Sequence, residues 1–149
     1  MSSYLYCDVL KQGSKEKIKT FQHLTWYSRD FFGDETDYRK YYLDFPLFEM
    51  GTETKPITGA GYLEQQIPCI SFNYTELKNL VDALDNVKFN IKLAFMRAKD
   101  TGAFDEASDL IETYTEVKNV YEELNYCLLC YKYDVDVEVE DIKFKFYIR

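Results

Sequence analysis

The chain has 149 residues and a formal net charge of −8, and 46% of its residues are hydrophobic and 17% aromatic. These values exclude a disordered chain and predict one domain, residues 1–149, whose core needs neither disulfides nor a structural metal. The negative charge disfavours direct binding to nucleic acid. The chain lacks a basic and apolar leader and an apolar run near ~18–20 residues, so we expect a cytoplasmic protein without membrane contact, in the host cytoplasm if a virus encodes it.

The first fifty residues predict mainly extended structure. Residues 3–10 are rich in β-favouring Tyr, Leu, Cys and Val and predict a strand that ends at a turn over residues 12–14. Residues 15–32 fit either a short helix or a strand that returns from a hairpin, and we slightly favour the strand. The aromatic-rich residues 38–50 predict a further extended segment.

A polar stretch and a short apolar run come next. Residues 51–65 contain three glycines and one proline and predict a surface loop. Residues 67–72 predict a short buried strand. Asn73 is suited to cap a helix, and Glu76 stands three residues later, where its side chain completes a capping box.

Two long amphipathic helices are the clearest prediction, because apolar residues recur every three or four positions. These residues are Leu77, Leu80, Leu84, Val87, Ile91, Ala94 and Ala98 in the first pattern and Ala107, Leu110, Tyr114, Val117, Tyr121, Leu124, Leu128 and Tyr131 in the second. The patterns predict two helices of ~40 Å each. Gly102 lies in the short connection and stops the first helix, so residues 74–131 are expected to form an antiparallel helical hairpin.

The C-terminus predicts a β-hairpin over residues 133–149. Hydrophobic residues occupy odd positions up to Val139 and even positions from Ile142 onward. A turn at residues 140–141 places Val139 opposite Ile142 and gives the hairpin one apolar and one charged face. We therefore predict an α+β fold, in which an antiparallel sheet that includes this hairpin packs against the helical hairpin of residues 74–131.

No residue pattern predicts a catalytic, metal or cofactor site. Cys127 and Cys130 have the spacing of a zinc or redox pair, and Cys7 and Cys69 could add two further thiolates. The pair lies within an apolar helical pattern, however, which favours packing in the core. His23 is the single histidine and has no nucleophile motif nearby. We therefore expect a protein that is not an enzyme and that binds no metal or cofactor.

The acidic face of the second helix is the candidate binding site. Residues 105–123 contain seven acidic side chains and one basic side chain, Lys118, which amounts to −6 of the net −8. The predicted partner-binding residues are Asp105, Asp109, Glu112, Glu116, Glu123 and Tyr126. Like charges one turn apart disfavour a helix slightly, so a row of this kind has a folding cost that a function would explain. The alternative is an ordinary solvated helix face.

Tyrosine is frequent in this chain, with 14 residues. The tyrosines that we expect at the surface are Tyr38, Tyr41, Tyr42, Tyr126, Tyr131 and Tyr133. Tyrosine is enriched at interface hot spots because it buries a large area at little entropic cost. The alternative is that a twisted sheet simply favours this residue type.

These features predict an acidic, non-enzymatic protein-binding module. Its composition is typical of an accessory protein of a phage or mobile element. The expected partner is a protein with a basic, nucleic-acid-binding surface, which a nucleic-acid mimic would occupy as an inhibitor, for example as an anti-defence protein. The alternative is a structural or assembly subunit that forms a homo-oligomer, or packs in a larger complex, through tyrosine-rich surfaces.

Overall fold

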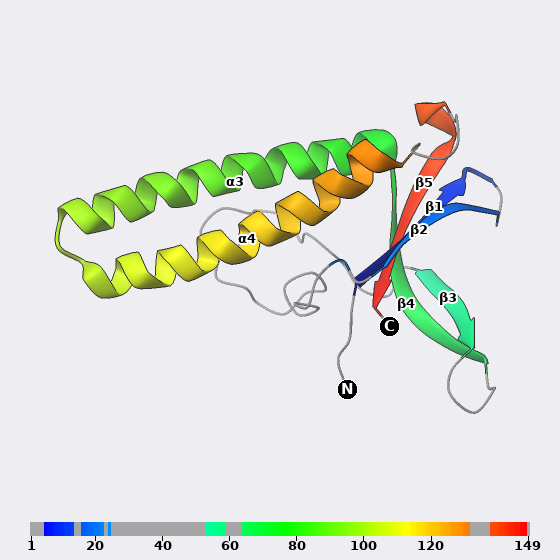
Figure 1. The fold of residues 1–149 in the computed structure, drawn as a ribbon, viewed down its shortest axis with the longest axis horizontal. Helices are drawn as coiled ribbons and strands as arrows, with labels where there is room; N and C mark the ends of the chain where they lie inside the picture. The colour runs from blue at the N-terminus through cyan, green and yellow to red at the C-terminus, as the bar shows by residue number, and fades with distance from the viewer. Residues whose placement is uncertain are drawn as a thin grey trace.

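The computed structural model describes residues 5–13, 16–22, 24, 53–58, 64–131 and 138–148. Over these residues the protein is α+β, with an antiparallel sheet at one end of two long helices (Figure 1). The elements are β1 (Leu5–Lys11), β2 (Lys17–Phe21), β3 (Glu53–Thr58), β4 (Glu64–Asn73), α3 (Tyr74–Asp100), α4 (Phe104–Cys130), the 3-10 helix η1 (Val139–Asp141) and β5 (Ile142–Ile148). None of the helices in the described ranges is both long and apolar enough to cross a membrane.

The sheet has the strand order β2-β1-β5-β4-β3, and all neighbouring strands are antiparallel. β1 confirms the strand predicted near the N-terminus. It turns through Gly13, whose φ of 77° favours glycine, into β2. Residues 15–32 fitted either a helix or a strand in the sequence, and β2 shows that Lys17–Phe21 form the slightly favoured strand, whereas residues 25–52 lie outside the described residues.

The predicted C-terminal β-hairpin is wrong. Val139 belongs to η1 rather than to a strand, and β5 pairs with β1 on one side and β4 on the other. Phe144 faces Val9 in one ladder and Phe72 in the other, so neither edge of β5 is open to a preceding strand. The alternation of apolar and charged residues specifies the faces of a strand but not its neighbours. Residues 132–137 lie outside the described residues.

The loop predicted over residues 51–65 is also wrong in part, because Glu53–Thr58 form β3. This strand pairs with the first half of β4, which makes β4 longer than the predicted strand at residues 67–72. Pro56 cannot donate a backbone hydrogen bond, but β3 lies at the edge of the sheet, where a missing donor is tolerated. Edge strands with polar side chains and a proline resemble loops in sequence.

One face of the sheet is apolar and contacts the helices. Cys7 and Val9 of β1 and Phe144 of β5 are fully buried. The ring of Phe144 packs edge-on against Tyr131 at the end of α4, with ring centroids 6.2 Å apart. Cys7 and Cys127 of α4 are neighbours in this core. The described strands and helices thus share one hydrophobic core.

The opposite face of the sheet contains a buried polar cluster around Asp8, which is 1% exposed. The Asp8 carboxylate accepts hydrogen bonds from the Thr20 hydroxyl at 2.9 Å and from the Tyr147 hydroxyl at 3.1 Å. The Lys17 ammonium lies 3.7 Å from the same carboxylate. These contacts join β1, β2 and β5 in one register, because Asp8 faces Thr20 in the β1–β2 ladder.

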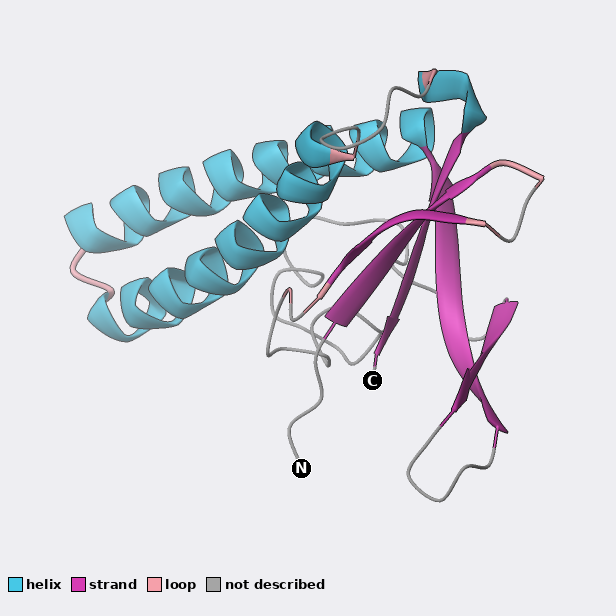
Figure 2. Ribbon diagram, turned by 45° about the vertical axis from the view of Figure 1, so that its right-hand side comes forward, coloured by secondary structure: helices cyan, strands magenta, loops and turns pink. Residues whose placement is uncertain are grey.

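α3 and α4 are each 27 residues long and lie side by side, extending away from the sheet in both views (Figures 1 and 2). β4 runs directly into α3, and Asn73 and Glu76 form the predicted capping box with bonds of 2.8 and 3.0 Å. Gly102, with φ of 78°, ends the first helix as predicted. The buried seam is formed mainly by leucines and valines at the predicted positions, including Leu84 and Leu110.

Candidate protein-binding surface

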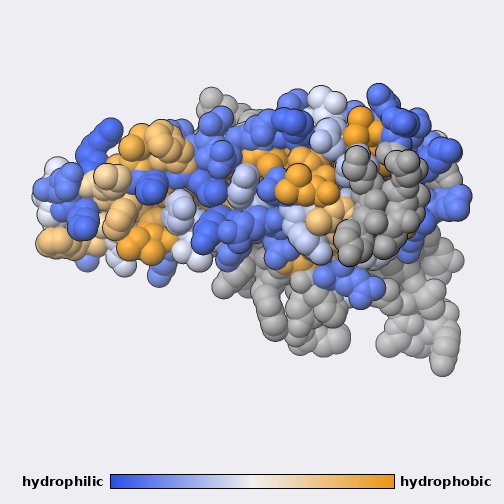
Figure 3. Space-filling model, turned by 45° about the horizontal axis from the view of Figure 1, so that its top comes forward, coloured by the Kyte–Doolittle hydropathy of each residue, from blue (hydrophilic) through white to orange (hydrophobic). Residues whose placement is uncertain are grey.

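The part of α3 and α4 far from the sheet exposes apolar side chains among polar ones (Figure 3). Phe89, Leu93 and Met96 of α3 are 61%, 43% and 51% exposed, and their spacings of four and three place them on one helix face. On α4, Phe104 and Ile111 are 72% and 50% exposed. Several exposed apolar side chains in one region are typical of an interaction surface.

The predicted acidic stripe is exposed at its N-terminal end. Asp105, Asp109 and Glu112 are exposed, and their spacings place them on one side of α4, about one turn apart. None of the ion pairs among the described residues involves these three carboxylates, and Lys118 is paired with Glu122. The side chain of Glu116 lies outside the described part. We call Asp105, Asp109 and Glu112 the acidic row.

The other end of the stripe differs from the prediction because Glu123 is half-buried. Val120 and Cys127, about one turn before and after it, are 2% and 0% exposed, and they widen the buried side of α4 near the sheet. Burial, and then the negative charge of Glu122, raises the pKa of the Glu123 carboxyl to about 7. Glu123 therefore lies at the boundary of the core and carries only part of a charge at neutral pH.

The predicted surface tyrosines divide between exposed and buried positions. Tyr126 is 53% exposed, and its ring meets Phe21 of β2 edge-on at 5.5 Å. Tyr131 is only 4% exposed, because its ring packs against Tyr74 and Phe144, so the prediction of an exposed side chain is wrong there. The remaining predicted positions, Tyr38, Tyr41, Tyr42 and Tyr133, lie outside the described residues.

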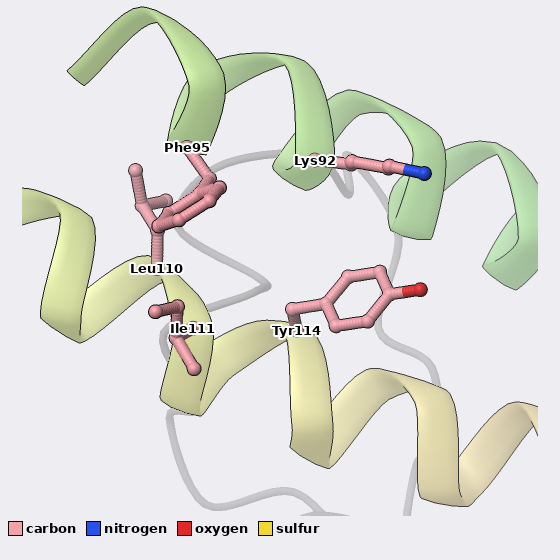
Figure 4. Close-up of a pocket in the computed structure, with 5 residues that line it drawn as sticks. All are labelled: Lys92, Phe95, Leu110, Ile111 and Tyr114. Carbon is pink, nitrogen blue, oxygen red and sulfur yellow. The ribbon is translucent and has the colours of Figure 1, made fainter. Parts of the chain in front are cut away.

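A cleft that the sequence did not predict lies between α3 and α4 and has a volume of about 260 Å³. Figure 4 shows its lining residues, Lys92 and Phe95 from α3 and Leu110, Ile111 and Tyr114 from α4. Phe95 and Ile111 are apolar residues that directly follow Ala94 and Leu110 of the predicted apolar patterns. The sequence therefore contains a signal for additional apolar surface at this place. The opening between the helices depends on side-chain packing across the hairpin, which periodicity alone does not specify.

The cysteines are mainly part of the core. Burial raises the pKa of the Cys7 thiol well above its usual value, and the neighbouring Cys127 thiol adds to this effect. Such a thiol is a poor nucleophile and a poor metal ligand. Cys69 is buried and Cys130 partly buried. Among the described residues, no three His, Cys, Asp or Glu side chains lie together as a metal site, and His23 lies outside the described part.

No protein-family model, curated protein or solved structure matches the chain. Its function is therefore inferred from the residues themselves. They present an exposed acidic row, exposed apolar side chains and a cleft, all on the two long helices.

Proposed function

We propose that this protein is a non-enzymatic binding module that uses the acidic row to occupy a basic, nucleic-acid-binding surface of a protein partner. The observation that carries the proposal is the exposure of Asp105, Asp109 and Glu112 on one side of α4, outside every ion pair among the described residues. Three carboxylates about one turn apart present a row of negative charge comparable to successive phosphates. A partner held in this way is inhibited, because its nucleic-acid site is blocked, as would suit an accessory protein of a phage or mobile element.

The proposal requires the two helices to act as a stiff arm packed on the sheet. Contacts at the base of the arm support this packing: Cys127 lies beside Cys7 in the core, and Tyr131 packs on Phe144. The acidic row lies in the half of α4 far from these contacts, beyond Gly102. A row held on such an arm reaches a groove on a partner without a steric clash from the sheet.

The row is expected to act mainly on the rate of association. Surface charges steer a partner of opposite sign, and the effect weakens when salt screens charges beyond about 8 Å at physiological ionic strength. A complex that depends on the acidic row should therefore form more slowly as salt increases, whereas its dissociation changes less.

The test is a capture experiment at low and moderate salt with lysate of the native host, followed by competition. The variant D105K/D109K/E112K reverses the acidic row. The control variant D82K/D100K/E140K makes the same change in net charge at three exposed positions elsewhere. We expect one basic partner to be captured by the native protein and the control but not by the row variant.

The captured partner is then purified and mixed with its nucleic acid. If the native protein displaces the nucleic acid and the row variant does not, the proposal is supported. The proposal would be overturned if the row variant captured the basic partner as well as the control variant does. It would also be overturned if the nucleic acid stayed bound in the complex with the native protein.

A second candidate function is that of an assembly subunit. It is favoured by exposed apolar and aromatic side chains on α4, because Phe104, Leu129 and Tyr126 are 72%, 69% and 53% exposed. A homo-oligomer whose mass in light scattering is unchanged by salt, and which the variant F104S/L129S reduces to a monomer, is the result that this function predicts.

A further inference from the structure

The cleft between α3 and α4 has an almost wholly apolar lining, with two polar groups at one end of it. Phe95 of α3 and Leu110 of α4 point toward each other in Figure 4, and Ile111 lies beside them. The Lys92 ammonium and the Tyr114 hydroxyl extend together toward the other end. A ligand with an apolar body and a polar head would therefore place its body against the apolar side chains and its head beside the two polar groups.

The polar end continues into a second cavity of about 390 Å³ that shares Lys92 and Tyr114. Lys88 also lines this cavity, but its ammonium lies 4.0 Å from the ring centroid of Tyr121 and 3.6 Å from Asp85. Lys92 takes part in none of the ion pairs among the described residues. It is therefore the cation at this site that can receive the charge of a ligand.

We propose that the cleft binds a small amphipathic monocarboxylate, whose apolar body contacts Phe95, Leu110 and Ile111. The carboxylate accepts hydrogen bonds from the Lys92 ammonium and the Tyr114 hydroxyl, and charge-assisted bonds of this kind are among the stronger ones. A single anionic head fits better than a polyanion, because Lys92 provides one ammonium among the described residues that line the cleft, in a chain of net charge −8.

The volume sets the size of the ligand. The 260 Å³ cleft lies just below the range of about 300–1,000 Å³ that is typical of small-molecule sites, so it suits a ligand at the small end of that class. Octanoate, with an alkyl chain and one carboxylate, is close to this size. The site does not depend on the proposed function, since none of its lining residues belongs to the acidic row.

The experiment compares three probes with the full chain: octanoate, the neutral octan-1-ol and the headgroup alone as acetate. Titrations are followed by NMR amide shifts and by calorimetry. Octanoate should bind at about ten times lower concentration than octan-1-ol, the ratio expected for one charge-assisted hydrogen bond. Acetate should not saturate. The largest shifts should fall on Lys92, Phe95, Ile111 and Tyr114.

Variants separate the polar and apolar contributions. K92M should weaken octanoate binding about tenfold and leave octan-1-ol unchanged, whereas K99M, at an exposed lysine outside the cleft, should change neither. I111D should weaken binding of both probes. Thermal unfolding of each variant verifies that the fold is retained, and both lysines are exposed, so their replacement removes no core contact.

Three results would overturn the proposal. One is that the native chain shows no saturable binding of octanoate up to about 10 mM, a very weak affinity on any scale. Another is equal affinity for octanoate and octan-1-ol. The third is an equal loss of affinity for octanoate in K92M and K99M, which would mean that binding depends only on the net charge of the protein.

Discussion

Tyr147, two residues from the end of the chain, donates a 3.1 Å hydrogen bond to Asp8, near its beginning. The bond joins β5 to β1, and the same carboxylate accepts a hydrogen bond from the Thr20 hydroxyl of β2. A polar cluster at a buried position in a sheet is stabilising only when its members satisfy one another. It therefore favours this order of strands over alternatives in which Asp8 would be buried without donors.

Replacement of Asp8 by alanine is expected to lower the free energy of unfolding by about 2–4 kcal/mol, because it leaves two hydroxyl donors without their acceptor. Tyr147→Phe removes one donor only and should cost about 1 kcal/mol. Urea unfolding followed by circular dichroism measures both values. Equal stability of native and D8A proteins would show that the cluster has no role in holding the strands.

The stability of the protein should depend on pH through Glu123. In the folded state its carboxyl keeps a proton up to a pH of about 7, whereas the unfolded carboxyl loses it near 4.5. Between these values the folded state binds more protons, so stability falls as pH rises and is regained on acidification. Because the side chain is only half-buried, solvent reduces the effect to about 1 kcal/mol, or roughly 2–4 °C in melting temperature.

The variant E123Q removes this titration and should be more stable than the native protein at pH 8 but not at pH 4. E112Q makes the same chemical change at an exposed position of the same helix and should keep the native pH dependence. Melting curves from pH 4 to 8 provide the comparison. A parallel pH dependence of E123Q and the native protein would contradict the assignment.

The capping box at the start of α3 should contribute to stability. Asn73→Ala removes the acceptor for the backbone N–H of Glu76 and is expected to cost about 1 kcal/mol. Asn73→Asp keeps the acceptor and should cost less. Chemical unfolding distinguishes the two, and an N73D variant as unstable as N73A would show that the side-chain oxygen is not what matters.

Gly102 should resist replacement because of its backbone conformation rather than lack of space. Its φ is 78°, and an added Cβ would meet no atom within 4 Å. Gly102→Ala is therefore expected to cost about 1–2 kcal/mol through left-handed strain alone. Gly102→Asn should recover part of this loss, because asparagine adopts that conformation more readily. Equal stabilities of all three proteins would contradict this explanation.

The helices were predictable because their signals are local. The apolar spacing, the Asn73 cap and the Gly102 stop all act within one or two turns, and the observed bounds Tyr74–Asp100 and Phe104–Cys130 differ little from the prediction. The neighbours of β5 were not predictable in the same way. The neighbours of β5 are determined by contacts such as that between Asp8 and Tyr147. These two residues are 139 positions apart, so their contact produces no periodic pattern in the sequence.

The candidate site was predictable only where the helix is surrounded by solvent. Asp105, Asp109 and Glu112 are exposed as the helical spacing indicated. Glu123 follows the same spacing, but Cys127 contacts β1, and that tertiary contact widens the buried side of the helix. Tyr131 was misassigned for a similar reason, because aromatic rings from three elements meet at the base of the arm.

The direct junction between β4 and α3 has a mechanical consequence. Asn73 is at once the last residue of a strand and the cap of a helix, so no loop separates sheet from arm at this point. A load on the far end, near Gly102, acts on the junction through a lever of ~40 Å, the length of the helix. The half of β4 next to this junction, from Cys69 to Asn73, pairs with β5, so bending of the arm is resisted first by that ladder, and the β3 ladder holds the other half of the strand. Stiffness at the tip thus depends on the hydrogen bonds of the sheet as well as on the core contacts at the base of the arm.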